Sequence, residues 1–411
     1  MLNMQKRDSY FLNIYSASLK FKRFFNRKEL SALILPPADP GSLGDEALVN
    51  ATFSHLKKLG FEKIGIISYK NGPKWKNIKP DETIEMQDFF TNNSLKSNLG
   101  FLSAISRYEI LYCLGADVLD GFYNKFHSLQ RIKMMDMAVK IGAKSIGLGF
   151  SFNEKPEPDT VESLSKLSSK VRLCARESIS QKRLLRLLKR PIELVADVAF
   201  LLQPKDSKIT KKVSTWINKQ HGNGRIVIGI NANYKLVNEL KSKNIDGLIN
   251  VYQSTIKGLY SKNKKFSFVL IPHDFRKIKN EFNDVILADK IFKTLPRNIA
   301  SNSIRIPSPF SAAEIKSICR NMELVLSGRM HLAIACLGQE TPVACITYQG
   351  KFEGLFKHFN LKGMTINPEQ SIKPGNLVKF LMPIIKKREK IRKQIHLKLP
   401  YVLELSKKNF I

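Results

Sequence analysis

The chain has 411 residues, 43% of them hydrophobic and 25% charged, with 68 Lys and Arg against 35 Asp and Glu and a formal net charge of +33. This length suits two medium domains rather than one, and the composition is ordinary for a globular protein. The positive excess attracts polyanions such as nucleic acid, anionic lipid, acidic polysaccharide or phosphorylated small molecules. A lysine-rich, solvated surface is the alternative explanation of the same charge.

The cysteines are odd in number and mostly lie in apolar runs: Cys113, Cys174, Cys319, Cys336 and Cys345. This pattern favours reduced core thiols, and no Cys/His cluster has the spacing of a zinc site. No stretch approaches the ~18 apolar residues of a membrane span, and none near the N-terminus is typical of a signal peptide. We therefore expect a cytoplasmic protein.

Residues 1–29 form a basic leader in which aromatic and aliphatic residues alternate with lysine and arginine. Such a segment is either an arm that packs on its own domain or an amphipathic helix at a membrane surface. The second alternative predicts peripheral contact with an anionic membrane, at the inner membrane face.

From Ser31 onward, short apolar runs alternate with helix-like segments. The expected strands are Ala32–Leu35, Ile64–Ser68, Ile110–Leu114, Ser145–Phe150, Val171–Ala175 and Glu193–Ala196. The expected helices are Asp45–Leu59, Leu129–Ile141, Thr160–Lys170 and Glu177–Lys189. This alternation predicts crossover units around a parallel sheet, in an N-terminal domain over residues 30–203.

A polar stretch over 204–224 indicates a linker. A second set of alternating strands and helices follows it over 225–375. Its expected strands are Ile226–Asn231, Phe266–Ile271, Ile304–Pro307, Leu324–Leu326 and Val343–Ile346, and its helices include Leu248–Leu259, Ala312–Asn321 and Leu332–Leu337. Residues 376–411 form a basic, helical C-terminal segment. The fold class is therefore α/β, with two doubly wound Rossmann-like domains facing across a cleft.

The most informative motif is Ser327-Gly328-Arg329-Met330-His331, which stands where an expected strand ends and a helix begins. Such a junction offers unpaired backbone N–H groups and the positive end of a helix dipole, which suit an anion. An arginine fork and a histidine at this place predict a phosphate or carboxylate site with a proton donor attached.

A similar junction occurs at Arg176, in Cys174-Ala175-Arg176-Glu177. A single arginine there is most simply a salt-bridge residue. Two of them, Arg176 and Arg329, one in each domain, can bind a dianion from opposite sides of a cleft.

Four further residues are candidates for the second substrate. Gly44 and Asp45 follow the first strand in a glycine-containing loop, Asp120 follows another strand, and His273 stands after an apolar run. A carboxylate at the end of a strand can orient a hydroxyl or act as a base. Each residue also has a structural alternative, as a turn residue or a hydrogen-bonded histidine.

Taken in order, these motifs resemble the polysaccharide pyruvyl transferase family. The resemblance runs from about Ser31 to Phe359 and is carried by five segments: Gly44-Asp45-Glu46-Ala47, Ala175-Arg176-Glu177-Ser178, Asp197-Val198-Ala199-Phe200, Pro272-His273, and Ser327 to Ile334 followed by Thr341-Pro342-Val343 and Tyr348-Gln349-Gly350-Lys351. The chain departs from the family pattern at Gly115-Ala116-Asp117 and at Gly147 to Ser151, in the half that would hold the acceptor.

The resemblance implies a fold similar to type-B glycosyltransferases and a reaction that moves pyruvate from phosphoenolpyruvate to a saccharide, free or lipid-linked. It implies no cofactor and no metal, since arginines supply the charge. Donor contacts are expected from Arg176, Ser327, Gly328, Arg329, Met330 and His331, and acceptor contacts from Gly44, Asp45, Asp120 and His273. His331 is expected to transfer a proton, with Asp45 or Asp120 as the base.

Two other functions fit parts of the sequence. A nucleotide-sugar glycosyltransferase of the same architecture would also bind phosphate at a helix start. A nucleic-acid-binding protein would explain the net charge, but the chain has no reader motif, and its aromatics are not interleaved with basic residues on an evident strand platform. We therefore expect no nucleic-acid partner. In the favoured interpretation, replacing Arg329 or His331 with alanine abolishes most turnover and leaves the fold intact.

Overall fold

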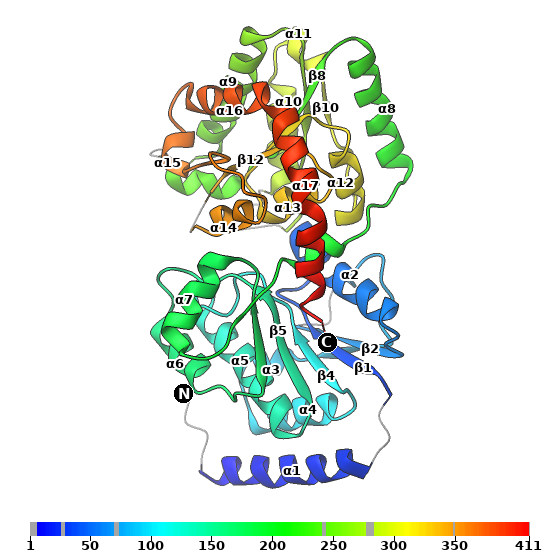
Figure 1. The fold of residues 1–411 in the computed structure, drawn as a ribbon, viewed down its shortest axis with the longest axis vertical. Helices are drawn as coiled ribbons and strands as arrows, with labels where there is room; N and C mark the ends of the chain where they lie inside the picture. Colours follow the sequence, from blue (N-terminus) through cyan, green and yellow to red (C-terminus); the bar gives the residue numbers. More distant parts are fainter. Residues whose placement is uncertain are drawn as a thin grey trace. The chain divides into compact units, whose positions relative to one another are not determined.

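The computed structural model describes residues 6–25, 29–69, 74–240, 244–276, 283–347 and 350–410. The chain divides into two compact units (Figure 1). Unit 1 contains Met1–Pro40, Leu48–Leu201 and Leu405–Ile411, and unit 2 contains Gly41–Ala47 and Leu202–Glu404. The boundaries at Ala47 and Glu404 fall inside helices, α2 (Leu43–Lys58) and α17 (Arg388–Lys407). The units are therefore not consecutive halves of the sequence.

Unit 1 is built on a parallel sheet of seven strands in the order β3-β2-β1-β4-β5-β6-β7. The strands are β1 (Ser31–Leu35), β2 (Lys63–Ser68), β3 (Glu82–Glu85), β4 (Ile110–Cys113), β5 (Lys144–Phe150), β6 (Val171–Ala175) and β7 (Glu193–Leu194). Strands β1 and β4 are buried along their whole length, because helices cover both faces of a parallel sheet. The edge strand β3 alternates between exposed and half-buried residues, so its sequence has no apolar run.

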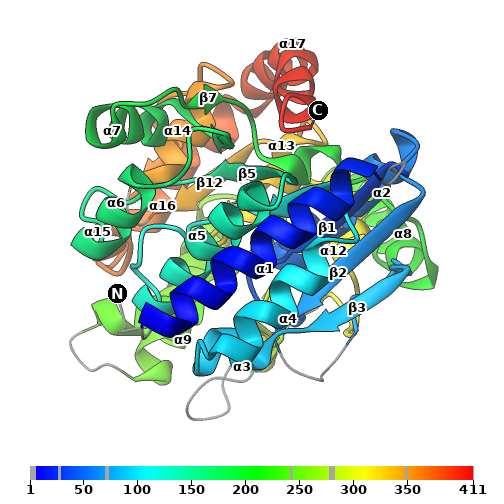
Figure 2. The same cartoon turned by 90° about the horizontal axis from the view of Figure 1, so that it is seen from below.

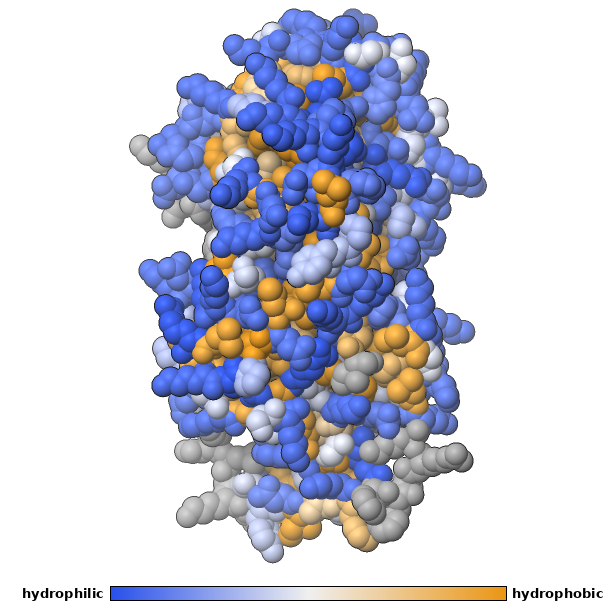
Figure 3. Space-filling model, in the orientation of Figure 1, coloured by the Kyte–Doolittle hydropathy of each residue, from blue (hydrophilic) through white to orange (hydrophobic). Residues whose placement is uncertain are grey.

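The helices of unit 1 occupy the connections between its strands, apart from α1, which precedes them. They are α1 (Lys6–Phe25), most of α2, α3 (Gln87–Thr91), α4 (Leu95–Ile105), α5 (Lys125–Lys140), α6 (Pro158–Ser165) and α7 (Ser178–Leu188), with a 3-10 turn η1 (Val198–Leu201). Helix α1 lies across α4 and α5 (Figure 2). The surface seen in Figure 3 is mostly hydrophilic, but apolar atoms are exposed over α1 at its lower end.

Unit 2 is built on a second parallel sheet, of six strands in the order β10-β9-β8-β11-β12-β13. The strands are β8 (Ile226–Ile230), β9 (Phe266–Leu270), β10 (Ser303–Arg305), β11 (Leu324–Ser327), β12 (Val343–Ile346) and β13 (Thr365–Ile366). The central strands β9, β11 and β12 are buried throughout.

Helices of unit 2 again occupy the connections between its strands, and others precede its first strand or follow its last one. They are α8 (Lys208–Gly222), α9 (Ile245–Lys262), α10 (Asp284–Lys293), α11 (Arg297–Ala300), α12 (Ala312–Cys319), α13 (Met330–Leu337), α14 (Lys351–Lys357), α15 (Pro368–Ser371), α16 (Asn376–Lys386) and most of α17, with a 3-10 segment η2 (Tyr234–Glu239). The prediction of two Rossmann-like α/β domains is therefore confirmed.

Each sheet has one topological switch point, where successive connections run to opposite sides of a starting strand. In unit 1 it lies between β1 and β4, and in unit 2 between β8 and β11. Ligands of open α/β sheets bind outside the carboxyl ends of the strands at this point. The fold thus directs attention to the residues that follow these four strands.

The structure differs from the sequence prediction in the predicted linker and in how the helical C-terminal segment is divided between the units. Residues 208–222, inside the predicted linker, form α8, which begins with a capping box between Ser207 and Thr210 and buries Val213 and Ile217. The stretch is mostly polar because only one face of this helix contacts the sheet. Residues 376–404 belong to unit 2 and 405–411 to unit 1, so they do not form a separate C-terminal segment. Among the described residues, no helix is both long and apolar enough to cross a bilayer.

Candidate active site

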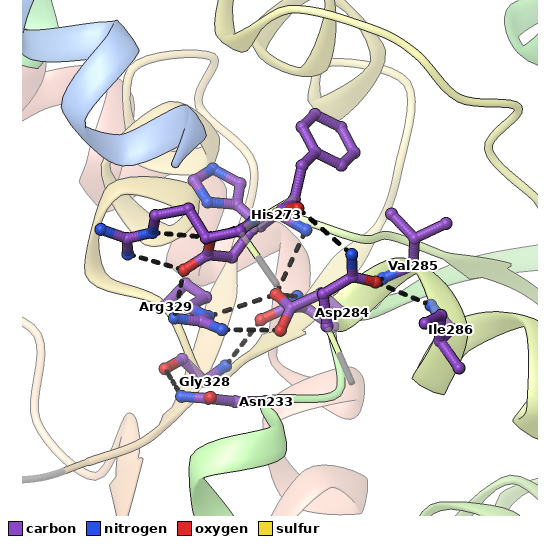
Figure 4. Close-up of polar contacts among 12 residues, drawn as sticks. Asn233, His273, Asp284, Val285, Ile286, Gly328 and Arg329 are labelled. Atoms are coloured by element: carbon purple, nitrogen blue, oxygen red, sulfur yellow. Dashed lines mark hydrogen bonds and ion pairs between the residues drawn. The ribbon is translucent and has the colours of Figure 1, made fainter. Parts of the chain in front are cut away.

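Five of the six predicted donor residues, Ser327 to His331, lie at the switch point of unit 2, at the end of β11 and directly after it. Asn231 and Asn233, which follow β8, hold the backbone of Gly328. Figure 4 shows Asn233 beside Gly328. The N–H of Gly328 donates to Asn231 Oδ1 at 3.2 Å, and its carbonyl accepts from Asn233 Nδ2 at 2.8 Å. A Cβ atom at residue 328 would lie 2.5 Å from Asn233 Cβ, so this close approach requires glycine.

Arg329 follows as the N-cap residue of α13, and its guanidinium is fixed by two carboxylates. Nε and Nη2 donate to the two oxygens of Asp284 at 3.2 and 2.6 Å, and Nη1 donates to Asp274 Oδ2 at 3.2 Å. The side chain of Arg329 is 13% exposed, whereas those of Asp274 and Asp284 are 2% and 0% exposed. Arg329 is thus held rigidly, with its remaining exposure at the start of the helix.

Burial and charge act in opposite directions on this cluster. Burial alone would lower the pKa of Arg329, but Asp284 and Asp274 raise it above its ordinary value. Burial raises the pKa of Asp284, although Arg329 opposes this. For Asp274, hydrogen bonds and charge from Arg276 and Arg329 outweigh burial and lower the pKa. The arginine therefore stays charged in this setting.

The glycine loop Gly41–Ala47 belongs to unit 2 and reaches this cluster. Ser42 forms a bridge with Asp274, the N–H of Leu43 donates to the carbonyl of His273 at 3.3 Å, and Phe275 N–H donates to the carbonyl of Gly41 at 2.9 Å. The carboxylate of Glu46 accepts from the N–H of Ala312 at 3.0 Å, at the start of α12. Backbone pairing therefore places the start of α2 beside the predicted donor residues of unit 2.

His331 packs directly against this loop. A Cβ atom built on Gly44 would lie 2.4 Å from His331 Nδ1 and 3.1 Å from its Cγ. Only glycine at residue 44 therefore allows the imidazole its position. The next residue, Asp45, lies 3.4 Å from Arg276 Nη1, and Arg276 in turn pairs with Asp274 at 2.7 Å.

Gly44 and Asp45, which were predicted to contact the acceptor, thus lie with the predicted donor residues of unit 2. The sequence had assigned them to the N-terminal domain because they follow its first strand, but the backbone pairing of Gly41 and Ser42 with the segment after β9 draws the loop into unit 2.

His273 is placed with the same cluster but is buried. Its pKa is lowered to about 3, first by burial and then by the positive charges of Arg329 and His331. Its backbone N–H donates to Asp284 Oδ2 at 3.2 Å, and its carbonyl receives the bond from Leu43. A histidine that stays neutral at ordinary pH in this position supports the loop rather than supplying a positive charge.

The cluster is not a simple patch of positive charge. The guanidiniums of Arg276 and Arg329 face the carboxylates of Asp45, Asp274 and Asp284. The Arg329 side chain makes no capping bond to α13, so it does not occupy the N–H donors of the first helical turn. Binding a dianion here would therefore depend on those donors and on His331 together with Arg329.

Arg176, the predicted partner of Arg329, lies in unit 1. Its Nη1 donates to Asp197 Oδ2 at 2.8 Å and its Nε donates to Ser151 Oγ at 2.7 Å. The side chains of Arg176 and Asp197 are only 1% and 2% exposed. The strand-to-helix junction is as predicted, and the guanidinium is buried and paired with Asp197 and Ser151. Its contact with the donor stays a prediction.

Asp120 also lies in unit 1, in the loop after β4. Its carboxylate accepts from the N–H groups of Phe122 at 3.1 Å and Asn153 at 3.0 Å, and the residue is buried. These bonds give Asp120 an architectural role in the loop. Its predicted role as a base stays a prediction, and Asp45 has the more exposed carboxylate and lies in the same unit as His331.

Several residues of the cluster were missed by sequence reasoning. Asn231 and Asn233 directly follow β8, so a search for polar residues at the switch point would have found them. Asp284 and Arg276 had no such signal, because their roles depend on contacts with Arg329 and with the glycine loop. Two residues of the family motif, Tyr348 and Gln349, lie outside the described residues. In the part of the chain that the structure describes, no group of three or more His, Cys, Asp or Glu has the arrangement of a metal site.

Comparison with solved structures supports the fold. A putative UDP-N-acetylglucosamine 2-epimerase from Listeria monocytogenes is similar with a TM-score of 0.59 and 11% identity, over 93% of this chain and 95% of that one. The UDP-GlcNAc 2-epimerase from Neisseria meningitidis gives 0.53 and 15%, over 92% and 98%. An α,α-trehalose-phosphate synthase (UDP-forming) from Burkholderia vietnamiensis gives 0.50 and 11%, over 94% and 97%. At these identities the likeness shows the fold alone, which is the two-domain architecture of type-B glycosyltransferases.

The family is established by the sequence. Residues 43–350 match the polysaccharide pyruvyl transferase family, so the chain belongs to this family and is a transferase. The matched range includes Gly44 and Asp45 of the glycine loop, Arg176 and the motif around Arg329. Comparison with curated proteins gives no match.

Proposed function

We propose that the protein transfers the pyruvate of phosphoenolpyruvate to two hydroxyls of a saccharide, forming a ketal and releasing phosphate. The observation that supports this most is the cluster in unit 2, where a fixed arginine, a helix start and a histidine held against Gly44 lie at the switch point of the sheet. Phosphoenolpyruvate carries a carboxylate and a phosphate, which arginine and backbone N–H groups bind well.

The chemistry requires one proton to move to carbon. The methylene carbon of the donor gains a proton, and two C–O bonds form from the saccharide hydroxyls to the neighbouring carbon. The bond from that carbon to the phosphate oxygen breaks. Of the two hydroxyl protons released, one balances the new methyl group and the other leaves with the phosphate.

In this proposal each residue has a separate part. Arg329 and the first N–H groups of α13 bind the anionic donor, and His331 in its protonated form supplies a proton or neutralises the leaving phosphate. Asp45 accepts a hydroxyl proton, because its carboxylate lies on the loop that contacts His331. Arg176 contributes a second cationic contact to the donor.

The test is incubation of the purified protein with phosphoenolpyruvate and a panel of acceptor glycans. Mass spectrometry should show a glycan with one added pyruvate, and phosphate should be released in equal amount. His331→Ala should lower this rate by about 10²–10⁴-fold. Release of a nucleotide from a nucleotide sugar, without use of phosphoenolpyruvate, would instead support a glycosyltransferase.

We further propose that the enzyme binds an anionic membrane through α1, where a lipid-linked acceptor would be presented. One face of α1 packs on unit 1 through Leu12 and Leu19, and Arg23 Nη1 donates to the carbonyl of Tyr108 at 2.7 Å. The opposite face exposes Tyr10, Ile14 and Phe21, which the helical repeat of about 100° per residue brings into one stripe. Exposed Lys20 and Lys22 lie beside this stripe.

An apolar stripe flanked by lysines is typical of a helix that lies in a membrane interface. Co-sedimentation with vesicles tests this, using phosphatidylglycerol against phosphatidylcholine alone. The double variant Tyr10→Ser/Phe21→Ser should bind anionic vesicles at least about tenfold more weakly. A matched control replaces two exposed apolar residues of α17, Leu397 and Tyr401, with serine. Equal binding by both variants would exclude α1 as the membrane contact.

A further inference from the structure

Two exposed aromatic side chains, Phe122 and Tyr123, stand at the carboxyl edge of the unit 1 sheet. They belong to the loop between β4 and α5, which follows one of the two strands at the switch point. Their side chains are 52% and 53% exposed. This is the place in an open α/β sheet where a ligand is expected.

The loop that carries these rings is firmly held. Besides the bonds of the Asp120 carboxylate, the carbonyl of Asp120 accepts from Thr160 Oγ1 at 3.1 Å and from Glu157 N–H at 2.9 Å. The N–H of Gly121 donates to Ser128 Oγ at 3.2 Å, and Gly121 has a φ of 80°, which favours glycine. The buried, hydrogen-bonded residues Asp120 and Gly121 therefore fix the exposed position of the two rings.

The rings are also fixed relative to each other. Their centroids lie 5.2 Å apart at an interplanar angle of 88°, an edge-to-face arrangement. The Tyr123 hydroxyl donates to Asp117 Oδ2 at 3.2 Å. An aromatic surface with a carboxylate beside it is thus present before any ligand binds.

Such a surface needs an explanation, because large aromatic side chains in water forgo the free energy of burial. Within the described part of the chain, the exposed neighbouring aromatics are Tyr10–Phe11 on α1 and Phe122–Tyr123. The first pair shares α1 with an apolar stripe and exposed lysines. The second pair has no comparable apolar stripe and lies at a ligand-binding edge.

We infer that Phe122 and Tyr123 form the platform on which the saccharide acceptor stacks, with the Asp117 carboxylate, which accepts from the Tyr123 hydroxyl, beside it. Sugar rings present apolar C–H faces and hydroxyl edges, which match aromatic faces and a carboxylate respectively. The inference rests on the proposed function and refines it. It moves the expected acceptor contact from the buried Asp120 to the exposed neighbours in the same loop.

Saturation-transfer NMR with methyl glycosides of galactose, glucose, mannose and N-acetylglucosamine tests this directly. At least one glycoside should receive saturation from aromatic protons of the wild-type protein. The double variant Phe122→Ala/Tyr123→Ala should weaken that binding roughly tenfold or more. The matched control Leu397→Ala/Tyr401→Ala removes two exposed apolar side chains of α17 and should bind as the wild type does.

Calorimetric titration with phosphoenolpyruvate separates this inference from the proposed function. The platform variant should bind phosphoenolpyruvate as tightly as the wild type, because the donor cluster lies in unit 2. Failure of the wild type to bind phosphoenolpyruvate would contradict the proposed function. The platform itself would be excluded by unchanged glycoside binding in the variant, by the absence of any glycoside signal in the wild type, or by a change in self-association alone.

Discussion

Arg176 and Arg329 stand at similar junctions in the two units, since each follows a strand and precedes a helix, although β11 lies at the switch point of its sheet and β6 lies beside the edge strand β7. Their surroundings differ. Arg176 pairs with Asp197 and Ser151 and is almost completely enclosed, whereas Arg329 pairs with Asp274 and Asp284 and keeps some exposure. The local sequence pattern is alike at both positions, and residues distant in the chain decide whether the guanidinium is enclosed or partly open. The pattern therefore predicts the position of an arginine better than its role.

The largest effect is expected from Arg329→Ala. Removing this cation leaves the buried carboxylate of Asp284 without its main partner, which costs about 3–5 kcal/mol of the free energy of unfolding. This revises the expectation that the alanine variant keeps its fold. Denaturation curves followed by circular dichroism measure the loss. In the double variant Arg329→Met/Asp284→Asn, most of the stability should return while turnover stays low; a stable single variant would contradict the contacts described here.

Arg176→Ala should cost a similar 3–5 kcal/mol, because Asp197 is equally buried. The informative variant is Arg176→Met/Asp197→Asn, which removes both charges and should fold. Its kinetics show whether Arg176 binds the donor, as Arg329 is proposed to do. If Arg176 binds the donor, the KM for phosphoenolpyruvate rises at least about tenfold in the folded double variant. An unchanged KM would assign Arg176 a purely structural role.

Gly44→Ala tests whether the position of His331 in unit 2 matters for turnover. The added methyl group would meet His331 Nδ1 at 2.4 Å, so the imidazole must move. We expect turnover to fall by roughly 10- to 100-fold, with a loss of about 1–3 kcal/mol in stability. The control is Gly100→Ala in α4, where the new Cβ would have no neighbour within 4 Å apart from adjacent residues and the backbone of its own helix. That variant should match the wild type in turnover and gain slightly in stability.

The smallest effect concerns the buried His273. Its folded-state pKa is about 3, below its ordinary value near 6.5, so the unfolded chain binds a proton first as the pH falls. Stability should therefore decline below about pH 6.5, and this group should contribute about 2 kcal/mol of the loss between pH 8 and pH 5. His273→Gln should remove that part of the pH dependence in urea titrations. His396→Gln, which alters a largely exposed histidine, should leave it unchanged.

The sequence predicted the buried parts of the fold well, because parallel strands covered on both faces appear as continuous apolar runs. Val171–Ala175 and Val343–Ile346 were predicted with the bounds that β6 and β12 have. The edge strand β3 was missed because its exposed residues interrupt any apolar run, and α8 was taken for a linker because its polar face dominates its composition. The structure of edge and surface elements such as β3 and α8 depends on contacts with other parts of the chain, and local composition does not reveal those contacts.

The candidate site was also predictable only in part. Arg329, Met330 and His331 stand at a strand-to-helix junction that the sequence shows directly. The carboxylates that fix Arg329 come from a segment after β9 and from the start of α10, and only the folded chain brings them to it. The glycine loop was recognised, but its membership of unit 2 depends on backbone pairing with His273 and Asp274.

The exchange of short segments between the units limits how this protein can be dissected. A fragment that begins after Leu201 would lack Gly41–Ala47, so Ala312 would lose the carboxylate of Glu46 and His331 its glycine neighbour. The complementary fragment would lack Leu405–Ile411, so the N–H of Gly149 would lose its 2.8 Å bond to Asn409 Oδ1. Neither half of the sequence can therefore be excised as an intact unit. In split-protein experiments, each short segment must be expressed together with the unit to which it belongs.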